Sequence, residues 1–92
     1  MKHPRVSIII PLKDTLPYFK KCIDSLLAQT YDDIEIIIVD DASSQDISGF
    51  LNQYNHTKKL IYLRNETSLG PGACRNLGLD IAQGQYISFC DS

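Results

Sequence analysis

Apolar and polar residues follow two distinct patterns along the 92-residue chain. Short runs of β-branched residues with nearly continuous apolar character are typical of strands buried on both faces of a parallel sheet. Longer stretches, in which apolar residues recur at three- and four-residue spacing, are typical of helices that pack on such a sheet. Together the patterns predict strands at 6–11, 34–39, 60–63 and 86–90, and helices at 16–29, 47–54 and 71–82.

The predicted elements follow one another as β-α-β-α-β-α-β in a single domain that spans residues 1–92. Their connections are short enough for right-handed parallel crossovers. We therefore predict an α/β fold, a Rossmann-like parallel sheet with helices on both faces. Asp14 or Thr15 is the expected N-cap of the first helix, and Gly84 is expected to end the third helix as its C′ residue.

Composition and charge narrow the class of protein. The chain is 43% hydrophobic and 22% charged with a net charge of -2, which is ordinary for a soluble globular domain. Because the nine Lys and Arg residues are scattered, no nucleic acid partner is expected. The apolar runs are too short to cross a bilayer, and the N-terminus does not resemble a secretory signal. We therefore expect a cytoplasmic protein, or one at the cytoplasmic face of a membrane.

The three cysteines, Cys22, Cys74 and Cys90, are odd in number and widely spaced. No CxxC pair indicates a structural zinc site. Each cysteine stands beside apolar residues, so we predict three reduced thiols in the core. A catalytic thiol would need a neighbouring base, and neither His3 nor His56 is close in sequence.

Charged residues follow three of the predicted strands. Lys13 and Asp14 come after the first strand, Asp40 and Asp41 close the second, and Asp91 follows the fourth. The carboxyl ends of parallel strands share one edge of a sheet, where ligands of doubly wound folds bind. Carboxylates crowded at this edge repel each other unless a cation compensates them. A divalent cation that carries a nucleotide diphosphate would do so, because oxygen ligands suit Mg²⁺ and Mn²⁺.

Five motifs resemble those of family-2 glycosyltransferases with the GT-A fold, in the order and spacing of that family. They lie at 6–11, 25–31, 35–43, 70–78 and 84–92, so the resemblance extends over nearly the whole length of the chain. The fourth looks like the family's G-x-x-x-A-R-N-x-G segment, and the fifth looks like the run into its D-x-D motif. The resemblance implies an inverting sugar transfer from a nucleotide-sugar donor, with UDP as the expected carrier. The implied acceptor is a glycan or a lipid-linked glycan in polysaccharide synthesis.

The resemblance also implies roles for individual residues. Pro11 would border the nucleobase, although it would also serve simply to end the strand. Asp41 would accept a hydrogen bond from the base, commonly from the N–H of uracil, and Asn65 would help to order the loop around it. Arg75 would approach the nucleotide or its phosphates, or lie on the helix surface paired with Asp80.

For Lys13, Asp40 and Asp91 the resemblance leaves more than one role open. Lys13 and Asp14 stand where the family usually has Tyr-Asn, whose ring stacks near the base, so the preference for UDP is left open. Lys13 would instead meet a phosphate or lie on the surface. Asp40 would contact the nucleotide or, as we favour, cap the turn at 43–44. Asp91 would be the first acid of the D-x-D motif and would contact the ribose or a Mn²⁺ or Mg²⁺ ion.

The chain ends at Ser92, before the second acid of the D-x-D motif, and it offers no good candidate for a general base. We therefore expect a donor-binding fragment that is inactive by itself. One alternative is a non-catalytic nucleotide-binding or interaction module of the same fold, which would form homodimers through exposed sheet edges. A phosphorelay receiver domain is disfavoured, because the acid pair follows the second strand and no Lys-bearing loop follows a later one.

Overall fold

The computed structural model describes residues 5–14, 16–27, 33–44 and 59–90. Within them the elements are β1 (Val6–Leu12), α1 (Leu16–Leu27), β2 (Ile34–Asp41), β3 (Lys59–Asn65), α3 (Pro71–Ile81) and β4 (Tyr86–Phe89). Each matches a predicted element, with ends that differ by one or two residues. The helix predicted at 47–54 lies outside the described residues. No helix in the described segments combines the length and the apolar character needed to cross a membrane.

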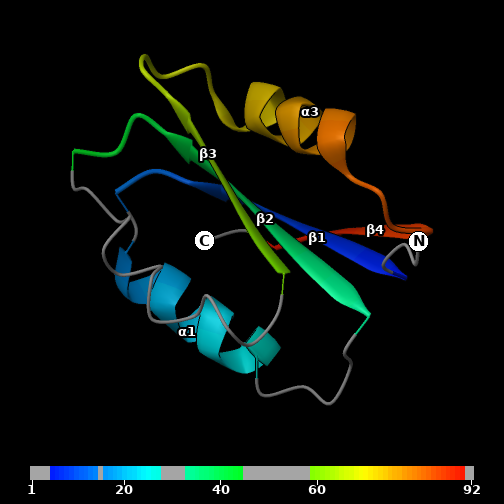
Figure 1. Cartoon of the computed structure of the whole chain (residues 1–92). Helices are drawn as coiled ribbons and strands as arrows, with labels where there is room; N and C mark the ends of the chain where they lie inside the picture. Colours follow the sequence, from blue (N-terminus) through cyan, green and yellow to red (C-terminus); the bar gives the residue numbers. More distant parts are fainter. Residues whose placement is uncertain (1–4, 15, 28–32, 45–58, 91–92) are drawn as a thin grey trace.

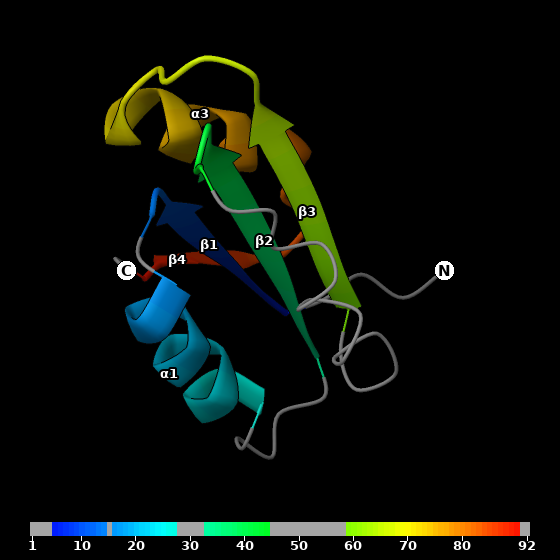
Figure 2. The same ribbon diagram turned by 90° about the vertical axis from the view of Figure 1, so that its left-hand side faces the viewer.

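The described strands form one parallel sheet in the order β3-β2-β1-β4. Helix α1 covers one face of this sheet and α3 covers the other, as both views show (Figures 1 and 2). The predicted Rossmann-like sheet with helices on both faces is therefore confirmed. The register pairs Asp41 with Asn65 and Leu12 with Asp40, so the carboxyl ends of β1, β2 and β3 lie at one edge.

The two central strands form the core, and their alternate residues face opposite helices. Residues 8 and 10 of β1 and residues 36 and 38 of β2 pack on the side of α1, around the buried Ile23. The intervening Ile9, Ile37 and Val39 pack on the side of α3, against Cys74. Strand side chains alternate with a period of two. The neighbouring acids Asp40 and Asp41 therefore lie on opposite faces of the sheet, Asp40 on the side of α1 and Asp41 on the side of α3.

Helix α3 lies close to β1, and Gly78 makes this approach possible. A Cβ atom at Gly78 would stand 2.6 Å from Cγ2 of Ile9, and Ile9 is fully buried. A β-branched side chain in a packed core cannot easily change its rotamer. The Gly78 of the fourth sequence motif thus serves helix packing.

Gly84 has a different role from the predicted one. Helix α3 ends at Ile81, and its C-cap is Ala82, which has an extended backbone (φ -66°, ψ 134°), so no left-handed glycine ends the helix. Gly84 lies against β1 instead, where an added Cβ would be 2.6 Å from the backbone nitrogen of Ser7. Its N–H donates to Oγ of Ser7 at 2.8 Å. The prediction of a C′ glycine was wrong because the helix stops earlier and glycine is needed for close contact between backbones.

The edge strand β4 exposes apolar side chains. Tyr86, Ile87 and Phe89 are 59%, 39% and 45% exposed, and among the described strands β4 pairs only with β1. Unpaired edges of this kind can pair with another strand. Self-association through an exposed sheet edge stays a prediction.

The predicted state of the cysteines was wrong for two of the three. Cys22 of α1 and Cys90, which follows β4, form a disulfide, whereas Cys74 remains a buried thiol. The pair is 68 residues apart in sequence, and the two residues meet because the Cys22 side of α1 packs on the sheet beside the end of β4. Sequence spacing alone carries no sign of such a contact.

Gly78→Ala is expected to lower the free energy of unfolding by about 1–3 kcal/mol, the usual effect of overpacking a core. Gly72→Ala in the same helix is the matched control, because an added Cβ there meets no atom within 4 Å. That control should be neutral or slightly stabilising, since alanine favours helix. Urea unfolding of the three proteins checks this, and equal stability of the two variants would contradict the packing role.

Reduction of the disulfide is expected to lower the free energy of unfolding by about 2–4 kcal/mol, because the cross-link restricts a long loop in the unfolded chain. Urea unfolding with and without dithiothreitol measures the difference. The double variant Cys22→Ser, Cys90→Ser should match the reduced protein and should not respond to the reductant. A wild-type protein that unfolds identically in both conditions would refute the pairing.

Candidate functional site

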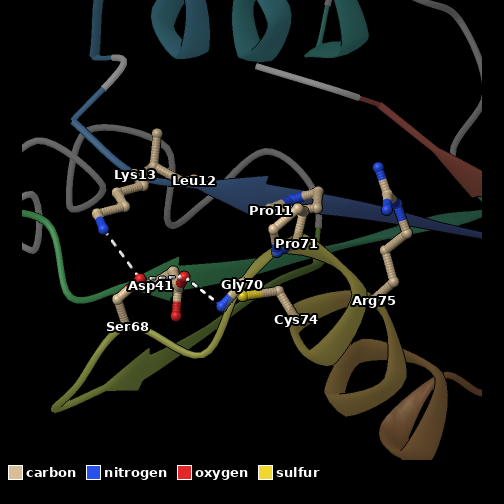
Figure 3. A pocket seen from close by; sticks show the side chains of 9 residues that line it. All are labelled: Pro11, Leu12, Lys13, Asp41, Ser68, Gly70, Pro71, Cys74 and Arg75. Carbon is tan, nitrogen blue, oxygen red and sulfur yellow. Dashed lines mark hydrogen bonds between the residues drawn. The ribbon is translucent and has the colours of Figure 1, made fainter.

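A cavity of about 450 Å³ opens at the carboxyl edge of the sheet, on the side of α3. Its walls come from the end of β1, the end of β2, the loop at 66–70 and the start of α3 (Figure 3). The alternation described above explains this position, because odd-numbered residues of β1 and β2 face α3. The lining residues are Pro11, Leu12, Lys13, Asp41, Ser68, Gly70, Pro71, Cys74 and Arg75.

The carboxylate of Asp41 stands in this pocket and is 5% exposed. Its Oδ1 accepts hydrogen bonds from the backbone N–H of Leu69 at 2.7 Å and from Nδ2 of Asn65 at 3.0 Å. Its Oδ2 accepts from the N–H of Gly70 and from Oγ of Ser68, both at 2.9 Å. These donors, above all the Leu69 N–H, hold the pKa of Asp41 far below its ordinary value despite the burial. The acid is therefore ionised at neutral pH.

Positive groups border the same pocket. Lys13 and Arg75 lie at opposite ends of the row of lining residues, with Asp41 and Gly70 between them (Figure 3). Nζ of Lys13 donates to Oγ of Ser68 at 2.9 Å. Helix α3 begins at Pro71, and its N-cap Gly70 has no side-chain hydrogen bond. Both residues line the cavity, so the positive end of the helix dipole lies at the cavity wall. Such a helix start, next to two cationic side chains, attracts anions.

Asp40 serves the structure instead of the pocket. It is fully buried, and its Oδ2 accepts from the hydroxyl of Tyr62 and from Nη1 of Arg64, both at 2.7 Å. Its Oδ1 accepts from the N–H of Ser43 at 3.0 Å, and Nη2 of Arg64 donates to the Ser43 carbonyl at 2.8 Å. Asp40 thus caps the predicted turn. The alternative, a contact with the nucleotide, is not supported, because Asp40 faces away from Asp41.

The loops after β1 and β2 are tied together by Asp14. Its carboxylate accepts from the N–H and the hydroxyl of Ser44, both at 2.8 Å, and its own N–H donates to Oγ of Ser43 at 2.9 Å. The Ser44 N–H, followed by the Ser44 hydroxyl, lowers the pKa of Asp14. Asp14 and Ala42 both have left-handed backbones, at φ 51° and 61°. Asp14 therefore joins the two loops. Helix α1 begins at Leu16, and the adjacent N-cap candidate, Thr15, lies outside the described residues.

The family model described as Glycosyl transferase family 2 matches residues 7–92. The chain belongs to this family. Poly(ribitol-phosphate) beta-glucosyltransferase of Bacillus spizizenii is 41% identical over 92 residues, which cover 96% of this chain and 14% of that protein. The chain therefore spans about a seventh of the length of that relative.

Solved structures of the family share the fold. TarS of S. aureus in complex with UDP has a TM-score of 0.89 at 30% identity, over 96% of this chain and 27% of TarS, and TarS has also been solved with UDP-GlcNAc. The mannosyltransferase PcManGT from Pyrobaculum calidifontis, in complex with GDP-Man and Mn²⁺, has a TM-score of 0.81 at 25% identity, over 99% of this chain and 28% of that chain. The GT-A assignment is thereby confirmed.

The structure brings four of the residues predicted for the glycosyltransferase site into one pocket: Pro11, Lys13, Asp41 and Arg75. Asn65 stands behind them, where its Nδ2 contacts both Asp41 and Sγ of Cys74. Sequence reasoning missed Ser68, because a serine in a polar loop carries no periodic signal. Cys74 was assigned to the core and also lines the cavity, as its position beside Arg75 in the fourth motif would have indicated.

The described residues do not fit a divalent metal ion. They contain no group of three or more His, Cys, Asp or Glu side chains that could hold one. Asp41 is surrounded by N–H and O–H donors rather than by other oxygen ligands. The metal prediction therefore rests on Asp91, which lies outside the described residues.

Asp41→Asn is expected to lower the free energy of unfolding at pH 7 by about 1.5–3 kcal/mol, the usual contribution of hydrogen bonds to a charged group. Because the pKa of Asp41 is lower in the folded than in the unfolded chain, this stabilisation is present above about pH 4 and is lost as the pH falls toward the folded pKa. The difference between the two proteins should therefore shrink from pH 7 to pH 3.

Urea unfolding at pH 7, 5 and 3 measures this dependence. Asp80→Asn, which changes an exposed aspartate of the same domain, is the control and should alter the stability little. A difference between wild type and Asp41→Asn that stays constant over this pH range would contradict the assigned charge state of Asp41.

Proposed function

We propose that the chain forms the donor-nucleotide-binding part of an enzyme that transfers a sugar from a UDP-linked donor to a glycan or lipid-linked acceptor. The observation that carries this proposal is the pocket itself, in which an ionised Asp41 stands beside the uncapped start of α3 and two cationic side chains. Support comes from the relatives solved with UDP, UDP-GlcNAc and GDP-Man. The cavity of about 450 Å³ is in the range of small-molecule sites.

In this proposal, one set of described residues binds the base of the nucleotide and another set binds its diphosphate. Asp41 and the neighbouring Pro11 receive the base, since a carboxylate is an acceptor for a ring N–H. The start of α3, Arg75 and Lys13 receive the diphosphate, because a helix N-terminus and cationic side chains stabilise phosphate charge. Binding in this orientation would present the donor at the carboxyl edge of the sheet, where ligands of open α/β sheets lie.

A divalent cation and the stereochemistry of transfer also belong to the proposal. The mannosyltransferase solved with Mn²⁺ supports metal use within the family. We propose Asp91, two positions after the end of β4, as a contact for that metal. Inversion at the transferred sugar rests on the resemblance of the motifs alone.

UDP should bind the wild-type chain saturably, and Asp41→Asn should weaken this binding by at least about 10-fold, because a hydrogen bond to a charged group contributes about 1.5–3 kcal/mol. Isothermal titration calorimetry measures both affinities. Asp80→Asn is the control for a lost charge on the surface and should bind UDP like wild type. Absence of saturable UDP binding, or equal binding by a folded Asp41→Asn, would refute the proposal.

A further inference from the structure

Asp41 already has as many hydrogen bonds as a carboxylate readily accepts. Each of its oxygens accepts two, from Asn65, Ser68, Leu69 and Gly70, and an ionised carboxylate offers about four lone-pair positions. A nucleobase N–H that binds Asp41 must therefore displace one of these donors. Which donor leaves determines what else in the pocket changes when the nucleotide enters.

Three of the donors are held in place by the fold. The N–H groups of Leu69 and Gly70 belong to the backbone that enters α3, and the Gly70 carbonyl accepts the N–H of Cys74 at 3.1 Å. Asn65 is paired with Asp41 in the register of β3 and β2, and its amide also contacts Cys74. Moving either backbone N–H would disturb the start of the helix. The Asn65 amide is less exposed than Ser68, and rotating it would break its contact with Cys74 as well as its bond to Asp41.

The hydroxyl of Ser68 is the donor that can leave. Ser68 is exposed, and rotation about one side-chain bond takes its Oγ away from Oδ2 of Asp41 without moving the backbone. The same oxygen accepts a hydrogen bond from Nζ of Lys13 at 2.9 Å. Figure 3 shows Ser68 between Lys13 and Asp41. Loss of the Ser68 contact to Asp41 would therefore also release the ammonium group.

We propose that Ser68 is an exchangeable cap on Asp41 that couples recognition of the base to recognition of the diphosphate. The base N–H replaces the Ser68 hydroxyl on Oδ2, and Lys13, no longer held by that hydroxyl in its original position, turns to the anionic diphosphate. The inference rests on the proposed function. Ser68 and Lys13 are then positioning and specificity residues of the donor site.

Exchange of this kind selects among nucleobases. A uracil ring carries an imide N–H, which can take the place of the serine hydroxyl on the carboxylate. The corresponding ring nitrogen of cytosine is an acceptor, which would face the negative charge of Asp41 without a proton between them. A pyrimidine without the N–H would leave the cap in place and Lys13 bound to Ser68.

Titration calorimetry of Ser68→Ala tests the exchange. The variant should bind UDP at least about 10-fold more tightly than wild type, the effect of removing one competing hydrogen bond to a charged group. It should show no gain with 3-methyl-UDP, whose ring nitrogen cannot donate. Thr67→Ala, a change at the neighbouring exposed residue, is the matched control and should bind both ligands like wild type. Melting curves establish that each variant is folded.

Lys13→Met tests the coupling to the phosphates. It should weaken binding of UDP by about 2- to 5-fold, in the range of an exposed ion pair, and should not weaken binding of uridine. If Lys13→Met weakened UDP and uridine equally, the release of Lys13 to the diphosphate would be refuted.

Two results would overturn the proposal in distinguishable ways. A folded Ser68→Ala that binds UDP no more tightly than wild type, while Asp41→Asn still weakens binding, would refute the exchange and leave the proposed function standing. A wild-type chain that does not bind UDP at all would refute both.

Discussion

The buried charge of Asp41 is the constraint on which the site depends. An ionised carboxylate that is 5% exposed is costly unless hydrogen-bond donors compensate it. All four donors come from residues 65–70. The charge therefore holds the loop between β3 and α3 in one conformation, including the left-handed φ of 94° at Gly70. The position of the helix start, and hence of the pocket wall, follows from this compensation.

Two adjacent acids at the end of β2 have separate roles because side chains alternate along a strand. Asp40 faces the side of α1, where Arg64, Tyr62 and Ser43 compensate it within the fold. Asp41 faces the side of α3 and the pocket. A shift of one residue in the register of β2 would exchange these surroundings. The pairing of β2 with both neighbours thus decides which acid is available to a ligand.

Local patterns were sufficient to predict most of the fold and part of the site. The β-branched runs gave the central strands, and the known geometry of parallel sheets placed Pro11, Lys13 and Asp41 at one edge. Contacts between distant segments could not be read in the same way. The disulfide of Cys22 with Cys90 depends on how α1 packs against the sheet, and the cap by Ser68 depends on the path of an irregular loop.

Glycine illustrates the same limit. Gly84 occupies a position that suggests the end of a helix, yet glycine is required there by close contact with Ser7 of β1. The spacing of residues along a chain predicts elements well, because each element has its own period. The distance between two packed elements leaves no comparable signal in a single sequence.

Helix α3 is held at both ends by acids of β2. Near its start the N–H groups of Leu69 and Gly70 bind Asp41, and beyond its end the N–H of Gln83 binds the fully buried Glu35 at 2.7 Å. Six residue steps along β2 separate Glu35 from Asp41, a span of about 20 Å. The thirteen steps from Gly70 to Gln83 cover about 20 Å at the helical rise.

Because these two spans agree, one rigid strand sets both the position and the tilt of the helix. The Ser7 hydroxyl reinforces the second attachment, since it donates to Glu35 at 2.6 Å and accepts the N–H of Gly84. Arg75 and Cys74 therefore reach the pocket from a helix that is fixed against the sheet at two points. In the described part of the site, the side chains of Ser68 and Lys13 can thus respond to a ligand while the wall that carries Arg75 stays in place.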